Sequence, residues 1–260
     1  MIYRDGDDSG DWRASARDKA TPVPAASFWR RVARAQTWAA IVATVFVGLP
    51  TLPGGNGTAG AVVGVAPYQV VVIGDSITGG SSVGGVGPDS WPSLTWNKLQ
   101  SDGIEVVPHV SGEGGSGYVE RGEDGTAFPE EAARLVTPND SVIVFFGSRN
   151  DASEPIDAVA AAARQSFDET RRVAPGAVLI VIGPIPPDPD RHDAVLAIRD
   201  ALREQATRAG VVWADPIAEE WLTTPGLIGW DGVHPNNAGH QELANRITPI
   251  IEGALGQNQV

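Results

Sequence analysis

The segment that most constrains the fold is an apolar run at residues 70–73, which ends in Gly74, Asp75 and Ser76. Four consecutive β-branched residues bounded by glycine are typical of a strand buried on both faces of a parallel sheet. In open α/β sheets, ligands bind beyond the carboxyl ends of the strands. The pattern therefore places Ser76 where a serine can act on a ligand, provided that another residue serves as its base.

Strand and helix patterns alternate along the rest of the chain. Strands are expected at 68–73, 104–110, 141–146, 177–182 and 211–214. Apolar residues at helical spacing predict helices at 91–100, 155–173, 190–209 and 236–255, the last capped by Asn236 or Asn237. Such alternation favours a parallel sheet with helices on both faces. We therefore predict an α/β fold, a three-layer α/β/α sandwich with about five parallel strands.

The N-terminal quarter of the chain differs from the remainder. Residues 1–36 are polar, of mixed charge and without apolar periodicity, which is typical of disorder. Residues 37–52 are a short apolar segment after three arginines, and they predict either a signal-peptide core or an uncleaved membrane anchor. Residues 53–66 form a glycine-rich linker to a domain at 67–256. We expect this domain to lie outside the cytoplasm, secreted or anchored to the cytoplasmic membrane.

The predicted domain is strongly acidic. Residues 1–59 hold seven Arg and Lys against five Asp, so the total charge of −13 leaves −15 on the remainder. A domain with this charge is poorly suited to bind nucleic acid. The sequence has no cysteine, which excludes disulfides, thiolate metal sites and a cysteine nucleophile within it. Its histidines and acids show no metal-ligand spacing, so we expect no metal.

Three further polar clusters follow predicted strands or precede the last helix. They are a glycine-rich loop at 111–117, the segment from Gly147 to Asp151, and the pair Asp231 and His234. All fall at the same edge of the predicted sheet. Serine, histidine, aspartate and asparagine on one rim can supply the nucleophile, base, orienting acid and oxyanion donor of acyl transfer.

Together these segments resemble a known family. Gly74-Asp75-Ser76, a glycine in the second loop, Gly147-x-x-Asn150-Asp151 and Asp231-x-x-His234 are similar to the four blocks of the SGNH (GDSL-type) hydrolases. The resemblance covers roughly residues 68–255, and the third block has one residue more than the common pattern. It implies a flavodoxin-like fold and a serine esterase or acylhydrolase that forms an acyl-enzyme intermediate and needs no cofactor.

The resemblance also implies roles for individual residues. Ser76 is the expected nucleophile, His234 its base, and Asp231 the acid that holds the imidazole. The expected oxyanion hole combines the Ser76 N–H group, a glycine N–H group of the second loop and the Asn150 side-chain amide.

The blocks also contain several candidate oxyanion-hole glycines and two further aspartates. Gly115 is the oxyanion-hole glycine that we favour, with Gly112 and Gly114 as alternatives. Asp75 and Asp151 are interpreted as structural residues. Asp75 is expected to cap N–H groups of its own turn, and Asp151 to cap the segment that follows it.

Two other functions are alternatives to hydrolysis. One is a catalytically silent relative that binds glycans at the cell envelope, although the complete set of candidate residues argues against it. The other is a dinucleotide-binding enzyme, because residues 112–117 match G-x-G-x-x-G. That motif belongs after the first strand of such a fold, whereas here it follows the second.

The substrate class is open. A small-molecule ester and the esters of carbohydrates or lipids all fit the resemblance. Four tryptophans near the rim are candidates either to line an acyl or sugar pocket or to pack in the core: Trp91, Trp96, Trp221 and Trp230. We expect a monomer without a nucleic-acid partner, attached to a membrane only if residues 37–52 remain as an anchor.

Overall fold

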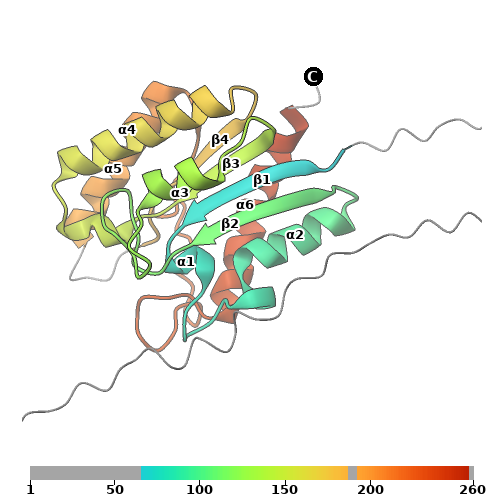
Figure 1. Cartoon of the computed structure of the whole chain (residues 1–260). Coiled ribbons are helices and arrows are strands. Elements are labelled where there is room, and N and C mark those ends of the chain that lie inside the picture. Colours follow the sequence, from blue (N-terminus) through green and yellow to red (C-terminus); the bar gives the residue numbers. More distant parts are fainter. Residues whose placement is uncertain (1–65, 187–191, 258–260) are drawn as a thin grey trace, which may run out of the picture. The chain divides into compact units, whose positions relative to one another are not determined.

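The computed structural model describes residues 66–186 and 192–257 (Figure 1). The predictions for residues 1–36 and 37–52, and for all but the last residue of 53–66, lie outside the described residues. Contacts divide the chain into two units, Met1–Gly60 and Ala61–Val260, and the description concerns the second. Within the described ranges, no helix combines the length and apolar character needed to cross a membrane.

Five parallel strands form one sheet in the order β2-β1-β3-β4-β5. Their bounds are β1 (Tyr68–Gly74), β2 (Val106–Gly112), β3 (Asp140–Phe146), β4 (Val178–Ile182) and β5 (Val212–Ala214). The predicted α/β fold is confirmed. The largest difference from the predicted bounds is at β2, because the Ile104 N–H group donates to the Leu99 carbonyl and so belongs to the preceding turn.

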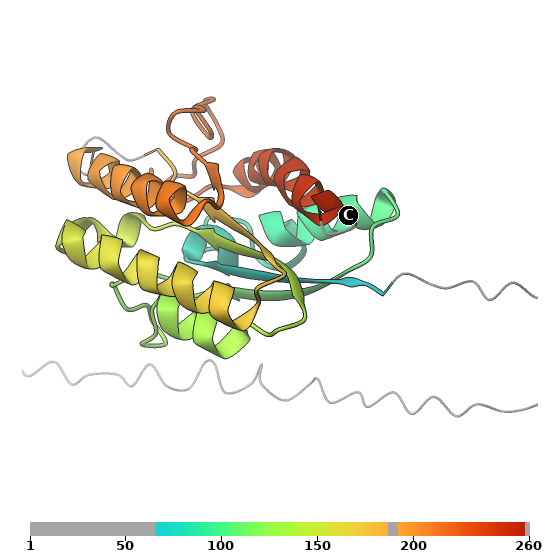
Figure 2. The ribbon, with the colours of Figure 1, turned by 90° about the horizontal axis from the view of Figure 1, so that it is seen from above.

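Helices cover both faces of the sheet, as Figures 1 and 2 show. The helices are α1 (Ser76–Gly79), α2 (Trp91–Ser101), α3 (Phe128–Leu135), α4 (Ile156–Val173), α5 (His192–Ala209) and α6 (Asn237–Gln257). Helices α2 and α6 pack on one face, and α3, α4 and α5 on the other. The Asn236 side chain accepts from the Gly239 N–H group at 3.1 Å, which confirms an asparagine cap on α6.

Strand β1 is buried on both faces. Val70 and Val72 belong to the core cluster shared with α2 and α6, whereas Val71 and Ile73 belong to the cluster shared with α3, α4 and α5. All four side chains are fully buried. This follows from the two-residue repeat of a strand, which sends alternate side chains to opposite faces.

Helix α3 has no counterpart in the sequence predictions. It spans only eight residues, so it offers little apolar periodicity to detect. Its terminal signals are present: Pro129 lies in the first turn with two glutamates, and Arg134 lies in the last turn. Proline at the start and charges matched to the helix dipole are the features from which it could have been predicted.

Backbone packs directly against backbone where β2 ends. A Cβ atom on Gly112 would lie 2.4 Å from the Gly79 nitrogen, and one on Gly79 would lie 2.1 Å from the Gly112 carbonyl oxygen. Gly112 is also in register with Gly74 of β1. Only glycines permit this approach, which fixes α1, and with it Ser76, relative to the loop that follows β2.

We predict that Gly112→Ala lowers the free energy of unfolding by about 1–3 kcal/mol, because the added methyl group must displace the backbone of α1. Urea denaturation measures the change. Gly176→Ala is the matched control, since no atom lies within 4 Å of a Cβ atom there. Equal stability of the two variants would contradict the prediction.

Candidate active site

Ser76 is the first residue of α1 and follows β1 with only Asp75 between them. Asp75 is the N-cap of this helix, and its Oδ1 atom accepts a hydrogen bond from the Ile77 N–H group at 2.8 Å. The predicted role of Asp75 as a capping turn residue is therefore confirmed. Since β1 is an interior strand and runs parallel to its neighbours β2 and β3, its end places Ser76 at the carboxyl edge of the sheet, where α/β folds bind ligands.

The loop before α6 holds Asp231 close to His234. The Oδ1 atom of Asp231 accepts from the N–H groups of Val233 and His234, both at 2.9 Å. A bridge between Ile228 and Pro235 closes the loop around them. These local bonds orient the second carboxylate oxygen of Asp231 toward the imidazole.

Ser76, His234 and Asp231 form a continuous chain of contacts. The Ser76 Oγ atom lies 2.9 Å from the His234 Nε2 atom, although the two residues are 158 positions apart. The His234 Nδ1 atom lies 2.7 Å from the Asp231 Oδ2 atom. Because an ionised carboxylate only accepts, Nδ1 carries the proton, and Nε2 is free to accept from the serine hydroxyl.

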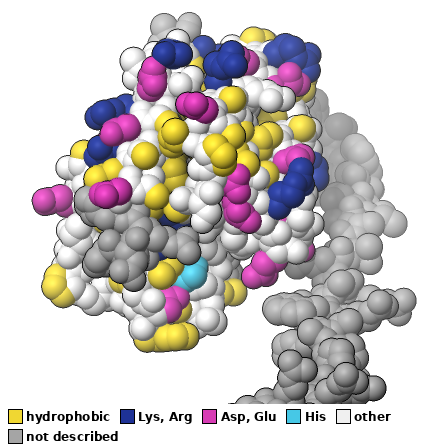
Figure 3. Space-filling model, turned by 90° about the vertical axis from the view of Figure 1, so that its left-hand side faces the viewer, with side chains coloured by type: hydrophobic (Ala, Val, Ile, Leu, Met, Phe, Trp, Pro, Cys, Tyr) yellow, Lys and Arg dark blue, Asp and Glu magenta, His cyan; other side chains and the backbone are white. Residues whose placement is uncertain are grey.

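This chain of contacts is open to solvent on one side. The His234 and Asp231 side chains are 27% and 22% exposed. Figure 3 views the molecule from the side toward which the strands point, and hydrophobic side chains gather on that face among scattered charges. Solvent therefore reaches the His234 and Asp231 end of this chain of contacts.

The environment of Asp231 favours its ionised form. Partial burial by itself raises the pKa of Asp231, but hydrogen bonds from the His234 side chain and from two backbone N–H groups outweigh it. The resulting pKa is about 2. Asp231 is therefore negatively charged at neutral pH and can stabilise a positive charge on the imidazole.

Asn150 lies in the 3-10 helix Arg149–Ser153, directly after β3. Its Nδ2 atom donates to the Ser116 carbonyl at 2.8 Å and, over a longer distance of 3.4 Å, to the Asp75 carboxylate. The amide thus lies between the turn that carries Ser76 and the glycine-rich loop. Three of the sequence-predicted segments meet at this amide.

The structure distinguishes the three candidate oxyanion-hole glycines by their surroundings. The backbone of Gly112 touches Gly79 in α1, whereas the nearest neighbours of Gly114 and Gly115 lie in the turn at 122–123. Gly115 has a positive φ of 79°. The choice of Gly115 as the oxyanion-hole glycine stays a prediction. The contact between Gly112 and the helix that carries Ser76 favours Gly112 for this role.

The prediction that Asp151 caps the segment that follows it is wrong. Its carboxylate accepts from the N–H groups of Tyr118, Val119 and Glu120 at 2.8, 3.0 and 2.8 Å, and also from the Ser148 hydroxyl. The backbone donors are 31 to 33 positions earlier in the chain. A buried carboxylate forms hydrogen bonds with the donors that the fold places around it. Local sequence patterns do not identify donors that are so distant along the chain.

A second carboxylate stabilises the loop that follows β2. Glu113 accepts from the N–H groups of Asp124 and Thr126 at 2.9 and 3.2 Å. The Thr126 hydroxyl contacts both Glu113 and the buried Glu131 of α3. No sequence pattern predicts this role of Glu113, whose only local signal is an acid inside a glycine-rich loop.

Three of the four rim tryptophans belong to the core. Trp91 and Trp221 are buried, and Trp96 packs against the same core cluster. His240 is buried beside Trp91, and its Nδ1 atom accepts a hydrogen bond from the backbone N–H group of Trp91 at 3.3 Å. Burial and the nearby charge of His234 lower the pKa of His240 to about 4, so it is neutral at pH 7.

Trp230 differs from the other three tryptophans, because its side chain is 84% exposed.

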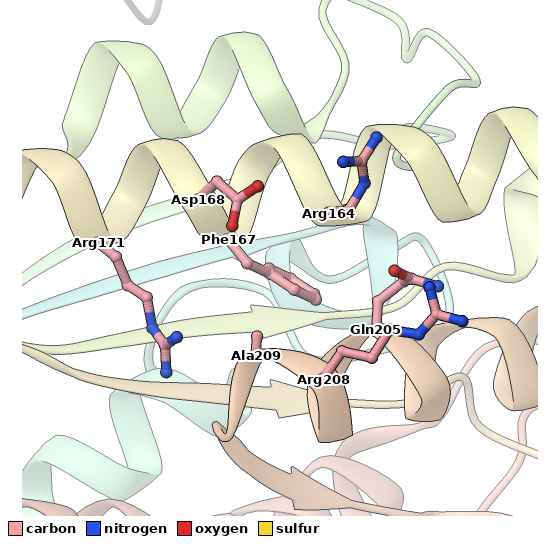
Figure 4. Close-up of a pocket in the computed structure, with 7 residues that line it drawn as sticks. All are labelled: Arg164, Phe167, Asp168, Arg171, Gln205, Arg208 and Ala209. Atoms are coloured by element: carbon pink, nitrogen blue, oxygen red, sulfur yellow. The ribbon is translucent and has the colours of Figure 1, made fainter.

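A separate cavity lies between α4 and α5 (Figure 4). Its volume is about 240 Å³, and none of the sequence-predicted site residues lines it. The lining residues are Arg164, Phe167, Asp168, Arg171, Gln205, Arg208 and Ala209. Among the described residues, no three His, Asp or Glu side chains gather in a way that would hold a metal ion.

The G-x-G-x-x-G match at residues 112–117 does not have the setting of a dinucleotide site. The loop follows the edge strand β2, and the next helix begins only at Phe128. A dinucleotide site requires a glycine loop that leads directly into a helix N-terminus after the first strand.

Comparison with known proteins gives a consistent result. Residues 72–242 match the family described as GDSL-like Lipase/Acylhydrolase. The protein described as GDSL lipase Rv0518 from Mycobacterium tuberculosis (strain ATCC 25618 / H37Rv) is 46% identical over 190 residues, which are 72% of this chain and 82% of that protein.

Solved structures share the fold. The crystal structure of TesA matches with a TM-score of 0.62 and 17% identity, over 72% of this chain and all of that one. The psychrotrophic esterase EstA from Pseudoalteromonas sp. matches with a TM-score of 0.58 and 11% identity, over 73% of this chain and 99% of that one. At these identities the likeness concerns the fold alone.

Asp75 makes stability depend on pH. Burial raises its pKa from 3.8 to about 6, against the opposing effects of the Ile77 N–H group and the Arg149 charge. The folded protein therefore binds this proton more tightly than the unfolded chain does. Its contribution to stability is complete below pH 3.8 and is lost as the pH rises to 6, a change of about 3 kcal/mol.

We predict that Asp75→Asn removes this dependence while an amide oxygen still caps Ile77. The variant should gain stability relative to the wild type by about 2 kcal/mol between pH 4 and pH 7, as measured by urea unfolding. Asp102→Asn, at an exposed position, serves as the control. A difference between Asp75→Asn and the wild type that stays constant over this pH range would refute the prediction.

Proposed function

The chain belongs to the GDSL-like lipase/acylhydrolase family, and we propose that it hydrolyses carboxylic esters with Ser76, His234 and Asp231 as its catalytic triad. Family membership supports ester hydrolysis. The choice of residues rests on one observation, the contacts of 2.9 Å from Ser76 to His234 and 2.7 Å from His234 to Asp231. Serine hydrolases on unrelated folds share this geometry.

In the first half of the proposed reaction, the Ser76 Oγ atom attacks the ester carbonyl carbon. The hydroxyl proton passes to the His234 Nε2 atom, which lies on the path at 2.9 Å. The protonated imidazole then gives this proton to the leaving alcohol as the carbon–oxygen bond breaks. Asp231 remains ionised and stabilises the imidazolium through its bond to Nδ1.

In the second half, water takes the place of the alcohol. His234 accepts a proton from the water, whose oxygen attacks the acyl carbon bound to Ser76. The ester bond to Ser76 breaks, the serine recovers its proton from His234, and the carboxylic acid leaves. The same base thus serves both halves.

The negative charge that develops on the carbonyl oxygen needs donors. The Ser76 N–H group is a candidate because the first N–H groups of a helix have no partner within it. The Asn150 amide is a second, since its 3.4 Å bond to Asp75 is long enough to be replaced by a bond to the oxyanion. Each donor of this kind contributes about 3–4 kcal/mol to transition-state stabilisation.

We predict that Ser76→Ala lowers kcat/KM for p-nitrophenyl acetate by at least about 10⁴-fold and abolishes labelling by a fluorophosphonate probe. His234→Ala should cause a loss of similar size. His109→Ala is the matched control, because His109 is an exposed histidine on β2.

Two results would count against the proposal. Full activity of Ser76→Ala would place the nucleophile elsewhere. No turnover of any ester by the wild type, together with binding to glycans, would favour the catalytically silent relative.

We also propose that the hydrolase domain acts outside the cytoplasm, because residues 37–52 have the pattern of a signal-peptide core or a membrane anchor. A fusion of residues 1–62 to a reporter that is active only outside the cytoplasm should give signal in a bacterial host. Cleavage of the fusion would indicate a secreted enzyme, and an intact membrane-bound fusion an anchored one. A silent reporter would refute export.

A further inference from the structure

The cavity between α4 and α5 has no part in the proposed reaction. Its lining residues lie from the middle of α4 onward and at the end of α5 (Figure 4). Helix α4 ends shortly before β4 begins, and α5 ends shortly before β5 begins, so both helix ends lie at the amino edge of the parallel sheet. Ser76 follows the carboxyl end of β1. The cavity therefore lies toward the opposite edge of the sheet from the proposed nucleophile.

The walls of this cavity are positively charged. Arg164, Arg171 and Arg208 line it, together with a single acid, Asp168. All four residues are exposed, so the cavity opens to solvent. Residues 1–59 are net positive, so the total charge of −13 makes the rest of the chain strongly acidic. Three arginines around one cavity are contrary to this background, and they favour an anionic ligand.

The guanidinium groups of the cavity are available to a ligand. No ion pair or hydrogen bond joins the Arg164 side chain to another residue in the described part of the chain. Arg171 donates to the Gly210 carbonyl over 3.5 Å, which is long for a hydrogen bond. Arg208 pairs with Glu204 at the surface, where both side chains are more than half exposed, and such pairs contribute little to stability. An anion that forms stronger bonds can replace both contacts.

A buried amide also lines the cavity. Gln205 is 7% exposed and contributes to the lining from α5. Its side chain forms no hydrogen bond with any other described residue. Native structures rarely leave a buried amide without a partner, because its desolvation is not compensated. The other two lining side chains, Phe167 and Ala209, are apolar and cannot pair with it. The amide therefore indicates a ligand in the cavity that accepts a hydrogen bond from the Gln205 Nε2 atom.

We propose that this cavity binds a dianionic phosphate group, carried by inorganic phosphate or by a small phosphomonoester. Three arginines and one aspartate give the lining a net charge of +2, which a dianion balances. Guanidinium groups bind phosphate through paired N–H donors, and Gln205 adds a neutral donor. The volume of about 240 Å³ is below the usual range for drug-sized ligands, which limits the occupant to a small molecule.

The bound phosphate group joins two helices. Arg164 and Arg171 belong to α4, whereas Gln205 and Arg208 belong to α5. A ligand held by donors from both helices stabilises their packing against each other. Because only the folded chain brings these donors together, phosphate raises the midpoint of thermal unfolding as its concentration increases.

Isothermal titration calorimetry of the full chain, at about pH 8 and constant ionic strength, tests the proposal. Inorganic phosphate and glycerol 3-phosphate are the two probes, and their affinities distinguish a site for the free ion from a site for a phosphomonoester. Saturable one-to-one binding of at least one probe is expected, together with a higher midpoint of thermal unfolding. Sodium chloride at the same ionic strength should not raise this midpoint, because chloride only screens charges.

Substitutions then assign the binding to the cavity. Arg164→Ala and Arg171→Ala should each raise Kd about ten-fold, because each removes charged donors. Asp168→Asn should lower Kd, because it removes the negative charge of the lining. Arg172→Ala on α4 and Arg203→Ala on α5 are the matched controls, and both should change Kd less than about two-fold. Each removes an arginine that pairs with a neighbouring acid outside the cavity.

Gln205→Leu tests the buried amide separately. Leucine keeps apolar packing on α5 but offers no donor, so we expect Kd to rise about three-fold. In phosphate-free buffer the variant should be at least as resistant to urea as the wild type, since no hydrogen bond within the described residues is lost. Unchanged affinity together with lower stability would give Gln205 a purely structural role and contradict the proposal.

Three results would overturn the phosphate site, and none of them bears on ester hydrolysis by Ser76. The first is no saturable binding of either probe up to about 10 mM. The second is an equal loss of affinity in the cavity variants and in the matched controls, which would indicate general attraction to positive charge. The third is competitive inhibition of p-nitrophenyl acetate hydrolysis by phosphate with an inhibition constant equal to Kd, which would place the ion beside Ser76.

Discussion

The burial of β1 on both faces is the constraint on which the rest of the structure depends. Its four central side chains are fully buried, alternately against two different layers of helices. A strand of this kind requires an interior place in the sheet, which β1 has between β2 and β3. Because Gly74, Asp75 and Ser76 follow it without a loop, core packing determines where Ser76 lies. The turn that carries the partly exposed Ser76 thereby gains the rigidity that a reacting group needs.

Three aspartates at the same edge of the sheet have different properties because their donors differ. Asp75 is buried with few donors, which raises its pKa to about 6. Asp231 has the imidazole and two backbone N–H groups as donors, which lower its pKa to about 2. Asp151 accepts four hydrogen bonds and fastens the loop after β2 to the turn that carries Asn150. Of the three, only Asp231 both contacts the imidazole and is partly exposed.

The accuracy of the sequence predictions follows how strongly each element is buried. Strands β1, β3 and β4 are unbroken apolar runs, and their predicted bounds differ from the structure by a single residue. The edge strand β2 is largely exposed and was placed two residues early. Helix α3, of only eight residues, was missed. Within the site, the spacing of Asp231 and His234 was informative because both lie in one loop, whereas the donors of Asp151 come from another strand connection.

The sequence by itself determined the order of strands and helices, the family and the set of candidate residues, because periodicity and short motifs are local properties of the chain. Only the tertiary structure decided which of those residues meet. It joined Ser76 to His234 across 158 positions and brought Gly112 against α1. It also buried Trp91 and Trp221 while leaving Trp230 exposed. Burial and contact depend on which distant segments pack together, and no local pattern specifies that.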